Sequence, residues 1–179
     1  MERVVCVAAF VLLVALLLPG VRALLRSRPR LFAAVKAVIF LVYIAGYLNE
    51  TLLFRPVMRY RTAEWELLWS YRKALALPDG MRSFLNGTVE VTSMPMLDNI
   101  LLNILLFVPM GYLLPFTFER IRPWQIVAIA FATSAATEVI QLTLKIGWFE
   151  FDDILNNTMG GLVGLLMARC LFWRRRREA

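Results

Sequence analysis

Amide and carboxylate side chains recur within apolar stretches of this sequence, where such groups are costly and often mark function. The candidate residues for a polar site are Asn99, Asn103, Glu138, Gln141, Asp152, Asp153 and Asn157. Residues of these types can bind a polar ligand, act as a general acid or base, or hold a hard cation such as Mg²⁺ or Ca²⁺. Their chemistry therefore leaves both binding and catalysis open.

Other kinds of site are disfavoured by what the sequence lacks. It contains no His, and its two cysteines, Cys6 and Cys170, each lie inside an apolar run. Zinc sites, disulfide frameworks and His-based acid–base chemistry are therefore not expected. We predict no cofactor and no metal site, with Asp152 and Asp153 as the candidates if a hard cation binds.

The spacing of the polar residues places them on single faces of helices. The sets are Tyr43, Tyr47 and Glu50; Asn99 and Asn103; Ser134, Glu138, Gln141 and Lys145; and Asp153, Asn157, Gly160 and Gly164. Neighbours within each set are three or four residues apart, which is about one helical turn. Four helices must therefore position the candidate site.

These helices belong to a chain with the composition of a membrane protein. Of its 179 residues, 60% are hydrophobic, compared with roughly 45–50% apolar residues in soluble domains, and its mean hydropathy is +0.65. The formal charge of +7 could indicate nucleic-acid binding, but the basic residues stand at the ends of apolar runs, where they act as topology signals. We predict an all-α integral membrane protein, a bundle of about five transmembrane helices, with no nucleic-acid partner.

Five segments approach the roughly 20 apolar residues that cross a bilayer. They are 4–18 with its continuation to 25, 31–48, 100–118, 124–144 and 154–173. The first could instead be a cleaved signal peptide, although its leading region holds little charge and no clear cleavage site follows. We group 1–97 as two spans and a long outer loop, 98–173 as a core of three spans, and 174–179 as a basic tail.

Arginine positions set the expected orientation. They cluster between the first two segments (22–30), between the third and fourth (120–122) and in the tail (174–177). Because positive residues collect on the cytoplasmic side, we predict a multi-pass cell-membrane protein with its N-terminus outside and its C-terminus in the cytoplasm. Six basic residues in the outer stretch 50–97 reduce this asymmetry.

The outer stretch 50–97 is too long for an ordinary connection. Within it, AEWELLWSYRKALAL (63–77) is rich in Trp, Leu and Tyr with charges interspersed. This pattern predicts a helix that either lies at the membrane interface or belongs to a small soluble cap on the bundle. A short extended piece is predicted at 88–92.

Depth within the membrane gives a second criterion. In this orientation Asn103, Glu138 and Asn157 lie four to six residues inside the outer ends of their helices, or roughly 6 to 10 Å deep at about 1.5 Å per residue. Tyr47 and Glu50 also lie at the outer end. The polar groups of four helices are therefore expected at one level in the outer half of the membrane, with a nearly apolar inner half.

Some of these residues also have structural interpretations. Asn and Gln side chains hydrogen-bond between membrane helices, and the spacing of Gly160 and Gly164 is typical of close helix packing, within the chain or in a homodimer. Pro109 and Pro115 are expected to bend or locally open the third helix.

The carboxylates have structural interpretations of their own. Glu138 should be neutral, paired with a cation such as Lys145, or in contact with a ligand, because an unpaired buried charge is costly. Asp152 could serve only to cap the N-terminus of the fifth helix.

Three stretches resemble consecutive signatures of the VanZ-like family of bacterial membrane proteins: NILLFVPMGYLLP (103–115), SAATEVIQL (134–142) and FEFDDILNNTMGGLVG (149–164). A weaker similarity extends to 47–55 and 67–75. The matching positions are Asn103, Pro109, Gly111, Glu138, Gln141, Asp152, Asp153, Asn157 and Gly160. Glu150 keeps the charge of the family's acidic position, whereas Trp148 replaces an Arg that often follows the Gly, leaving Lys145 as the nearest cation.

The resemblance implies a small multi-helix membrane protein, and the family's founding member is associated with resistance to the glycopeptide teicoplanin. We predict an outer-leaflet pocket that binds a membrane lipid, a cell-wall precursor or a lipophilic glycopeptide antibiotic and so contributes to teicoplanin tolerance. The alternatives are a membrane enzyme acting on a lipid-linked substrate through Glu138 or Asp153, and a structural subunit. The lack of His and of a recognised nucleophile arrangement counts against the enzyme.

Overall fold

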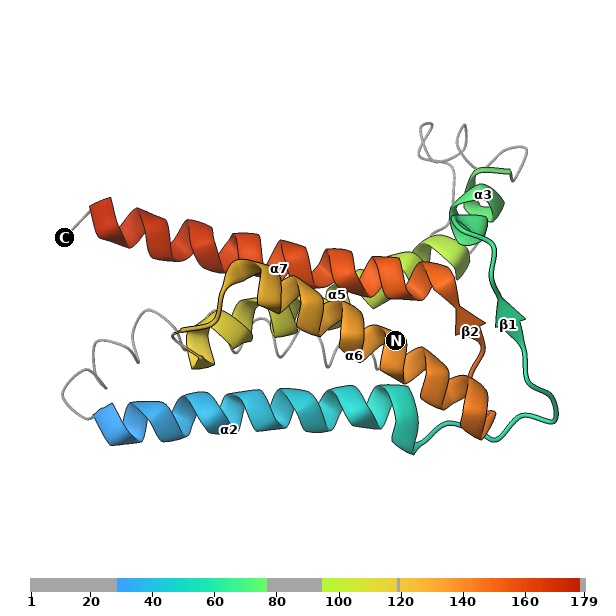
Figure 1. Ribbon diagram of the computed structural model, residues 1–179, viewed down its shortest axis with the longest axis horizontal. Coiled ribbons are helices and arrows are strands. Elements are labelled where there is room, and N and C mark those ends of the chain that lie inside the picture. Colours follow the sequence, from blue (N-terminus) through green and yellow to red (C-terminus); the bar gives the residue numbers. More distant parts are fainter. Residues whose placement is uncertain (1–28, 77–94, 119, 178–179) are drawn as a thin grey trace.

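The computed structural model describes residues 29–76, 95–118 and 120–177. Helices dominate, and the two strands that these residues form are short (Figure 1). The long helices are α2 (Pro29–Leu48), α5 (Pro95–Thr117), α6 (Pro123–Leu144) and α7 (Phe151–Arg177). A π-helical turn, η1 (Asn49–Leu53), continues α2, and α3 (Trp69–Ala76) is a short helix outside the bundle. The predicted span 4–25 and the extended piece at 88–92 lie outside the described residues.

Three helical segments among the described residues are long and apolar enough to cross a membrane. They are Ala33–Leu53, Met96–Thr117 and Pro123–Leu144, and they correspond to the predicted segments 31–48, 100–118 and 124–144. The predicted fifth span, 154–173, is helical as part of α7, whose first turns carry Asp and Asn side chains. The prediction of an all-α membrane protein is confirmed.

Proline marks the start of α6. Pro123 is its first residue, a position where a fixed backbone angle suits the helix and a missing N–H costs nothing. The backbone N–H of Arg122, just before it, donates to the Gln125 side chain at 2.7 Å. Local sequence therefore fixes where this helix begins.

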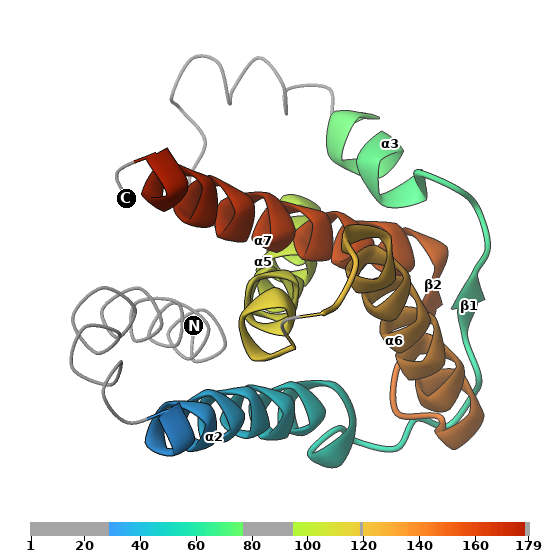
Figure 2. The ribbon, with the colours of Figure 1, turned by 60° about the vertical axis from the view of Figure 1, so that its left-hand side comes forward.

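The helix α5 occupies the centre of the bundle and contacts α2, α6 and α7 (Figure 2). In Figure 1, α5 and α7 run in one direction and α2 and α6 run in the other. The start of α2, the turn between α5 and α6 and the C-terminal end of α7 therefore share one end of the bundle, which we call the basic end. Segments 49–68 and 145–150 lie at the opposite end, the loop end. The side of the membrane that each end faces stays a prediction.

Glycine allows α5 and α7 to pack closely. A Cβ atom added to Gly111, Gly160 or Gly164 would lie within 2.1 Å of a backbone oxygen on the facing helix. The face with Gly160 and Gly164 is thus covered by α5 of the same chain. It is not available for the homodimer contact that the sequence suggested. The helix α5 itself runs through Pro109 and Pro115 as one element.

The segment predicted as a helix at 63–77 is different at its start. Residues Ala63–Glu64 form strand β1, which pairs in parallel with strand β2 (Phe149–Glu150). The Trp65 ring stacks on Phe149, with 4.4 Å between ring centroids. The prediction of helix for 63–68 is therefore wrong, because pairing with a distant segment overrides the local preference.

The helix in this segment begins only at Trp69. Immediately before it, Leu68 has a left-handed backbone with φ of 62°, a conformation that costs a non-Gly residue energy and interrupts a helix. The carbonyl of Leu68 accepts the backbone N–H of Arg72 at 2.9 Å. Leu68 is therefore the N-terminal capping position of α3.

Candidate functional site

A cavity of about 380 Å³ lies at the loop end of the bundle. Six of the seven predicted site residues line it: Asn99, Asn103, Glu138, Gln141, Asp153 and Asn157. They come in pairs from α5, α6 and α7. The end of α2, with η1 and the residues after it, completes the wall through Tyr47, Glu50, Thr51 and Arg55. The volume is within the range of roughly 300–1,000 Å³ that is common for ligand sites.

Asp152, the seventh predicted residue, is not part of this cavity. Its fully buried carboxylate accepts the backbone N–H of Leu68 at 2.6 Å, the backbone N–H of Ser70 at 3.0 Å and the Ser70 hydroxyl at 2.6 Å. The prediction that Asp152 caps its own helix is wrong. It caps α3, because the side chain reaches the free N–H groups at the start of that neighbouring helix.

Asn156 extends this attachment of α3 by one turn of α7. The hydroxyl of Tyr71, on α3, donates a hydrogen bond to the Asn156 side-chain oxygen. Sequence analysis missed Asn156, although its spacing of four residues from Asp152 places both on one helical face. The first two turns of α7 thus carry two polar faces: Asp152 and Asn156 hold α3, whereas Asp153 and Asn157 line the cavity.

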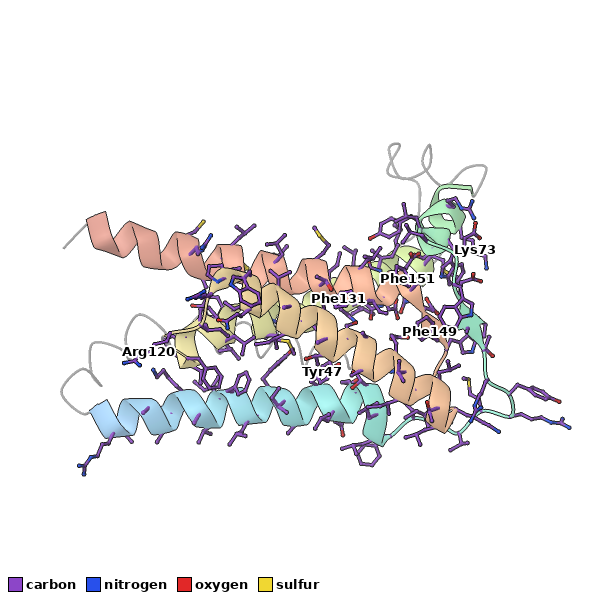
Figure 3. The ribbon with its side chains drawn as sticks, viewed as in Figure 1. Tyr47, Lys73, Arg120, Phe131, Phe149 and Phe151 are labelled. Carbon is purple, nitrogen blue, oxygen red and sulfur yellow. The ribbon has the colours of Figure 1, made fainter. Side chains whose placement is uncertain are left out.

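Hydrogen bonds between α2 and α6 fix another wall of the cavity. The hydroxyls of Tyr47 and Thr137 are 2.5 Å apart, and the Gln141 side chain donates to the carbonyl of Thr51 at 2.9 Å. Figure 3 shows Tyr47 between the two helices. Because each of these side chains is buried, the contacts hold α6 at a defined rotation, with Glu138 turned into the cavity.

Glu138 is 3% exposed, and its Oε2 atom accepts the backbone N–H of Glu150 at 3.0 Å. Among the described residues, the cation whose charge acts on Glu138 is Arg55, not Lys145 as the sequence suggested. Arg55 is the functional candidate that sequence reasoning missed. It lies just after the α2 span, and helical spacing does not relate it to the polar residues of α5, α6 and α7 that line the same cavity.

A missing side chain at Gly147 makes room for Arg55. A Cβ atom on Gly147 would lie 3.1 Å from Nη1 of Arg55 and 2.8 Å from Oε1 of Gln141. Lys145 contributes through its backbone. It ends α6 with a left-handed φ of 59°, and its carbonyl accepts the N–H of Met58 at 2.6 Å. Residues 145–147 therefore shape the cavity rim through their backbone.

Carboxylates gather at one side of the cavity. Glu138 and Glu150 both repel the Asp153 carboxylate, and Arg55 attracts it. Burial raises the pKa of Glu150, and repulsion by Asp152 and Glu64 raises it further, while Lys73 opposes the change. No three acidic, His or Cys side chains among the described residues are placed to hold a metal ion, and the Asp152 carboxylate is occupied by α3.

One amide atom next to the cavity lacks a hydrogen-bond partner among the described residues. Asn157 donates to the Ser134 hydroxyl at 2.8 Å, but its Oδ1 atom accepts nothing. The Asn103 side chain, in contrast, interacts with the Asp153 carboxylate. Unsatisfied buried polar atoms are uncommon in folded proteins, so the Asn157 oxygen indicates that a polar group is still needed here.

The fold and the cavity define a class: a helical membrane protein with a charged cavity at one end of its bundle. Comparison with known proteins identifies the family within that class. A family model described as VanZ/LLP1 matches residues 4–173, and this chain belongs to that family. The family resemblance seen in the sequence motifs is thereby confirmed.

One curated relative is Protein VanZ of Enterococcus faecium, which is 35% identical over 63 residues. The match covers 35% of this chain and 39% of the relative, so it spans well under half the length of either protein. No solved structure matches this chain.

Proposed function

We propose that this chain binds the polar part of an envelope lipid, a cell-wall precursor or a lipophilic glycopeptide in its loop-end cavity. The observation that carries the proposal is the arrangement of that cavity, in which amides and carboxylates from three helices meet Arg55 within about 380 Å³. Helix packing alone does not call for such a space, because membrane helices associate through small residues and direct contacts.

The proposal also assigns the cavity a role in glycopeptide tolerance. Membership of the VanZ/LLP1 family and the partial similarity to Protein VanZ support this role. We place the cavity in the outer leaflet, where glycopeptides and cell-wall precursors meet the membrane. The gathering of Arg30, Arg120 and Arg122 at the opposite end of the bundle supports this orientation (Figure 3 labels Arg120).

Substitution of the cavity carboxylates tests the function. In a teicoplanin-sensitive host, Glu138→Gln and Asp153→Asn should each reduce the tolerance conferred by the chain, because they remove charge with little change in shape. A loss of binding of about 1.4 kcal/mol corresponds to a tenfold weaker interaction. The matched control is Glu66→Gln, since Glu66 is an exposed carboxylate whose ion pair with Arg72 lies outside the cavity. Full tolerance in both cavity variants, at normal membrane levels, would contradict the proposal.

The orientation has its own experiment. Glu150 is a partly exposed residue on the cavity wall, so Glu150→Cys can be labelled in a chain in which Cys6 and Cys170 are replaced by Ser. A membrane-impermeant maleimide added to intact cells should modify position 150. Labelling only after the cells are opened would place the cavity on the cytoplasmic side and overturn the outer-leaflet assignment.

A further inference from the structure

The charge of the cavity wall indicates the kind of headgroup that it takes. Its charged side chains are four acidic residues, Glu50, Glu138, Glu150 and Asp153, and one basic residue, Arg55. In a partly buried site of low dielectric, such an excess of carboxylates attracts a cation more strongly than in water. A ligand with only negative charge would meet three more acidic than basic side chains.

Hydrogen bonding points to a donor-rich cation. Asn157 is 6% exposed, lines the cavity and has a side-chain oxygen without a donor among the described residues. Asp153 lies on the same face of α7. Two carboxylates, Glu138 and Glu150, act on it as well as the cation Arg55. A primary ammonium group carries three N–H donors and no acceptor, so one such group can satisfy the Asn157 oxygen and offset the charge of Asp153 and Glu138.

Arg55 supplies the complementary feature. Its guanidinium lies next to Gly147, which has no side chain, and its Nε atom donates to the Glu50 carbonyl at 3.3 Å. A guanidinium presents several N–H groups in a planar fork and favours phosphate oxygens. Arg55 and the carboxylates therefore give the cavity side chains of both charges.

We propose that the cavity holds a zwitterionic headgroup in which a primary ammonium is joined to a phosphodiester, as in an aminophospholipid. The ammonium lies among Glu138, Asp153 and Asn157, and the phosphate contacts Arg55. Leu102, Leu106 and Ile146 also line the cavity and accommodate the less polar part of the lipid. This assignment rests on the proposed binding function and names its ligand class.

Native mass spectrometry of the full chain tests the assignment. The protein is equilibrated in detergent with equal amounts of phosphatidylethanolamine, phosphatidylcholine and phosphatidylglycerol of identical acyl chains. Phosphatidylcholine keeps the phosphate and the positive charge but has no N–H donors, and phosphatidylglycerol has no cation. We expect roughly tenfold preferential retention of phosphatidylethanolamine, equivalent to about 1.4 kcal/mol.

Variants distinguish the contact with the ammonium from the contact with the phosphate. Asp153→Asn and Glu138→Gln should reduce the preference for phosphatidylethanolamine over phosphatidylcholine, whereas Arg55→Gln should weaken retention of all three lipids and leave that preference in place. Glu66→Gln should change nothing. Circular dichroism and thermal melting identify any variant that fails to fold. If a variant fails, the lipid preference of the wild-type chain still tests the headgroup assignment.

Several outcomes would overturn the headgroup assignment. They are equal retention of the three lipids, preference for phosphatidylglycerol, and specific displacement of phosphatidylethanolamine by millimolar Mg²⁺, which would indicate a metal site instead. Displacement by free phosphoethanolamine would show that the headgroup alone suffices, while failure of free headgroup to compete would assign binding to the lipid form. If Glu138→Gln and Asp153→Asn abolish teicoplanin tolerance but no lipid is preferred, the assignment fails and the proposed function stands.

Discussion

Helices α5 and α7 pack closely at the basic end of the bundle and line a polar cavity at the loop end. Toward the basic end, buried Leu113 and Leu165 belong to the apolar core, and Gly164 brings the backbones together. Toward the loop end, the same helices contribute Asn103 and Asp153 to a cavity. The change occurs within about one turn, because the last glycine contact, between Gly160 and the carbonyl of Ile104, directly adjoins the cavity residues. The closely packed part of α5 and α7 thus adjoins the cavity and closes it on the side of the basic end.

The largest expected effect comes from filling the glycine contact. A Cβ atom on Gly164 would lie 2.0 Å from the carbonyl oxygen of Val108, so Gly164→Leu must push α5 and α7 apart. We expect destabilisation at or above the upper end of the roughly 1–3 kcal/mol that overpacking costs, measured as thermal unfolding in detergent. Gly46→Leu is the matched control, since a Cβ atom there has no neighbour within 4 Å. Equal stability of the two variants would show that the close contact is not required.

A smaller effect is expected where α3 is attached. The Asp152 carboxylate accepts three hydrogen bonds from the start of α3, and Asp152→Asn removes its charge. A hydrogen bond to a charged group contributes about 1.5–3 kcal/mol to stability. Because this loss is local, trypsin should cut faster at Arg59, Arg61 and Arg72. Asp153→Asn, one residue away but on the cavity face, should leave the cleavage rate unchanged. Faster cleavage in both variants would mean that the two faces of α7 do not act separately.

The smallest effect is a pH-dependent one at Glu150. Its folded-state pKa is raised by burial and by neighbouring acids, so ionisation disfavours the folded state. That cost is absent below the unfolded pKa and complete above the folded pKa. Glu150→Gln should therefore raise the melting temperature more at pH 8 than at pH 4. An increase of the same size at both pH values would exclude ionisation of Glu150 as its cause.

Much of the cavity could be anticipated because it depends on helical periodicity. Asn99 with Asn103, Glu138 with Gln141, and Asp153 with Asn157 each share a face, and the structure brings all three pairs to one cavity. The apolar segments likewise predicted the long helices of the bundle. What periodicity cannot supply is the packing partner of a given face.

The remaining features depend on contacts between distant parts of the chain. The partners of Asp152 lie 82 and 84 residues earlier in the sequence, so the sequence suggested a cap on its own helix, α7, instead of on α3. The charge of Arg55 acts on Glu138 because α2 and α6 are neighbours. Strand β1 forms from residues that favour a helix, because Phe149–Glu150 offers it a partner.

The doubled residues at the start of α7 have a consequence for comparing this chain with its relatives. Asp152 and Asp153, like Asn156 and Asn157, are identical neighbours with different tasks, since successive residues of a helix point about 100° apart. An alignment displaced by one position would still place Asp on Asp and Asn on Asn while exchanging the α3 attachment with the cavity wall. A relative that has only one Asp here must therefore be assigned by which neighbour that side chain meets, Ser70 on α3 or Glu138 on α6.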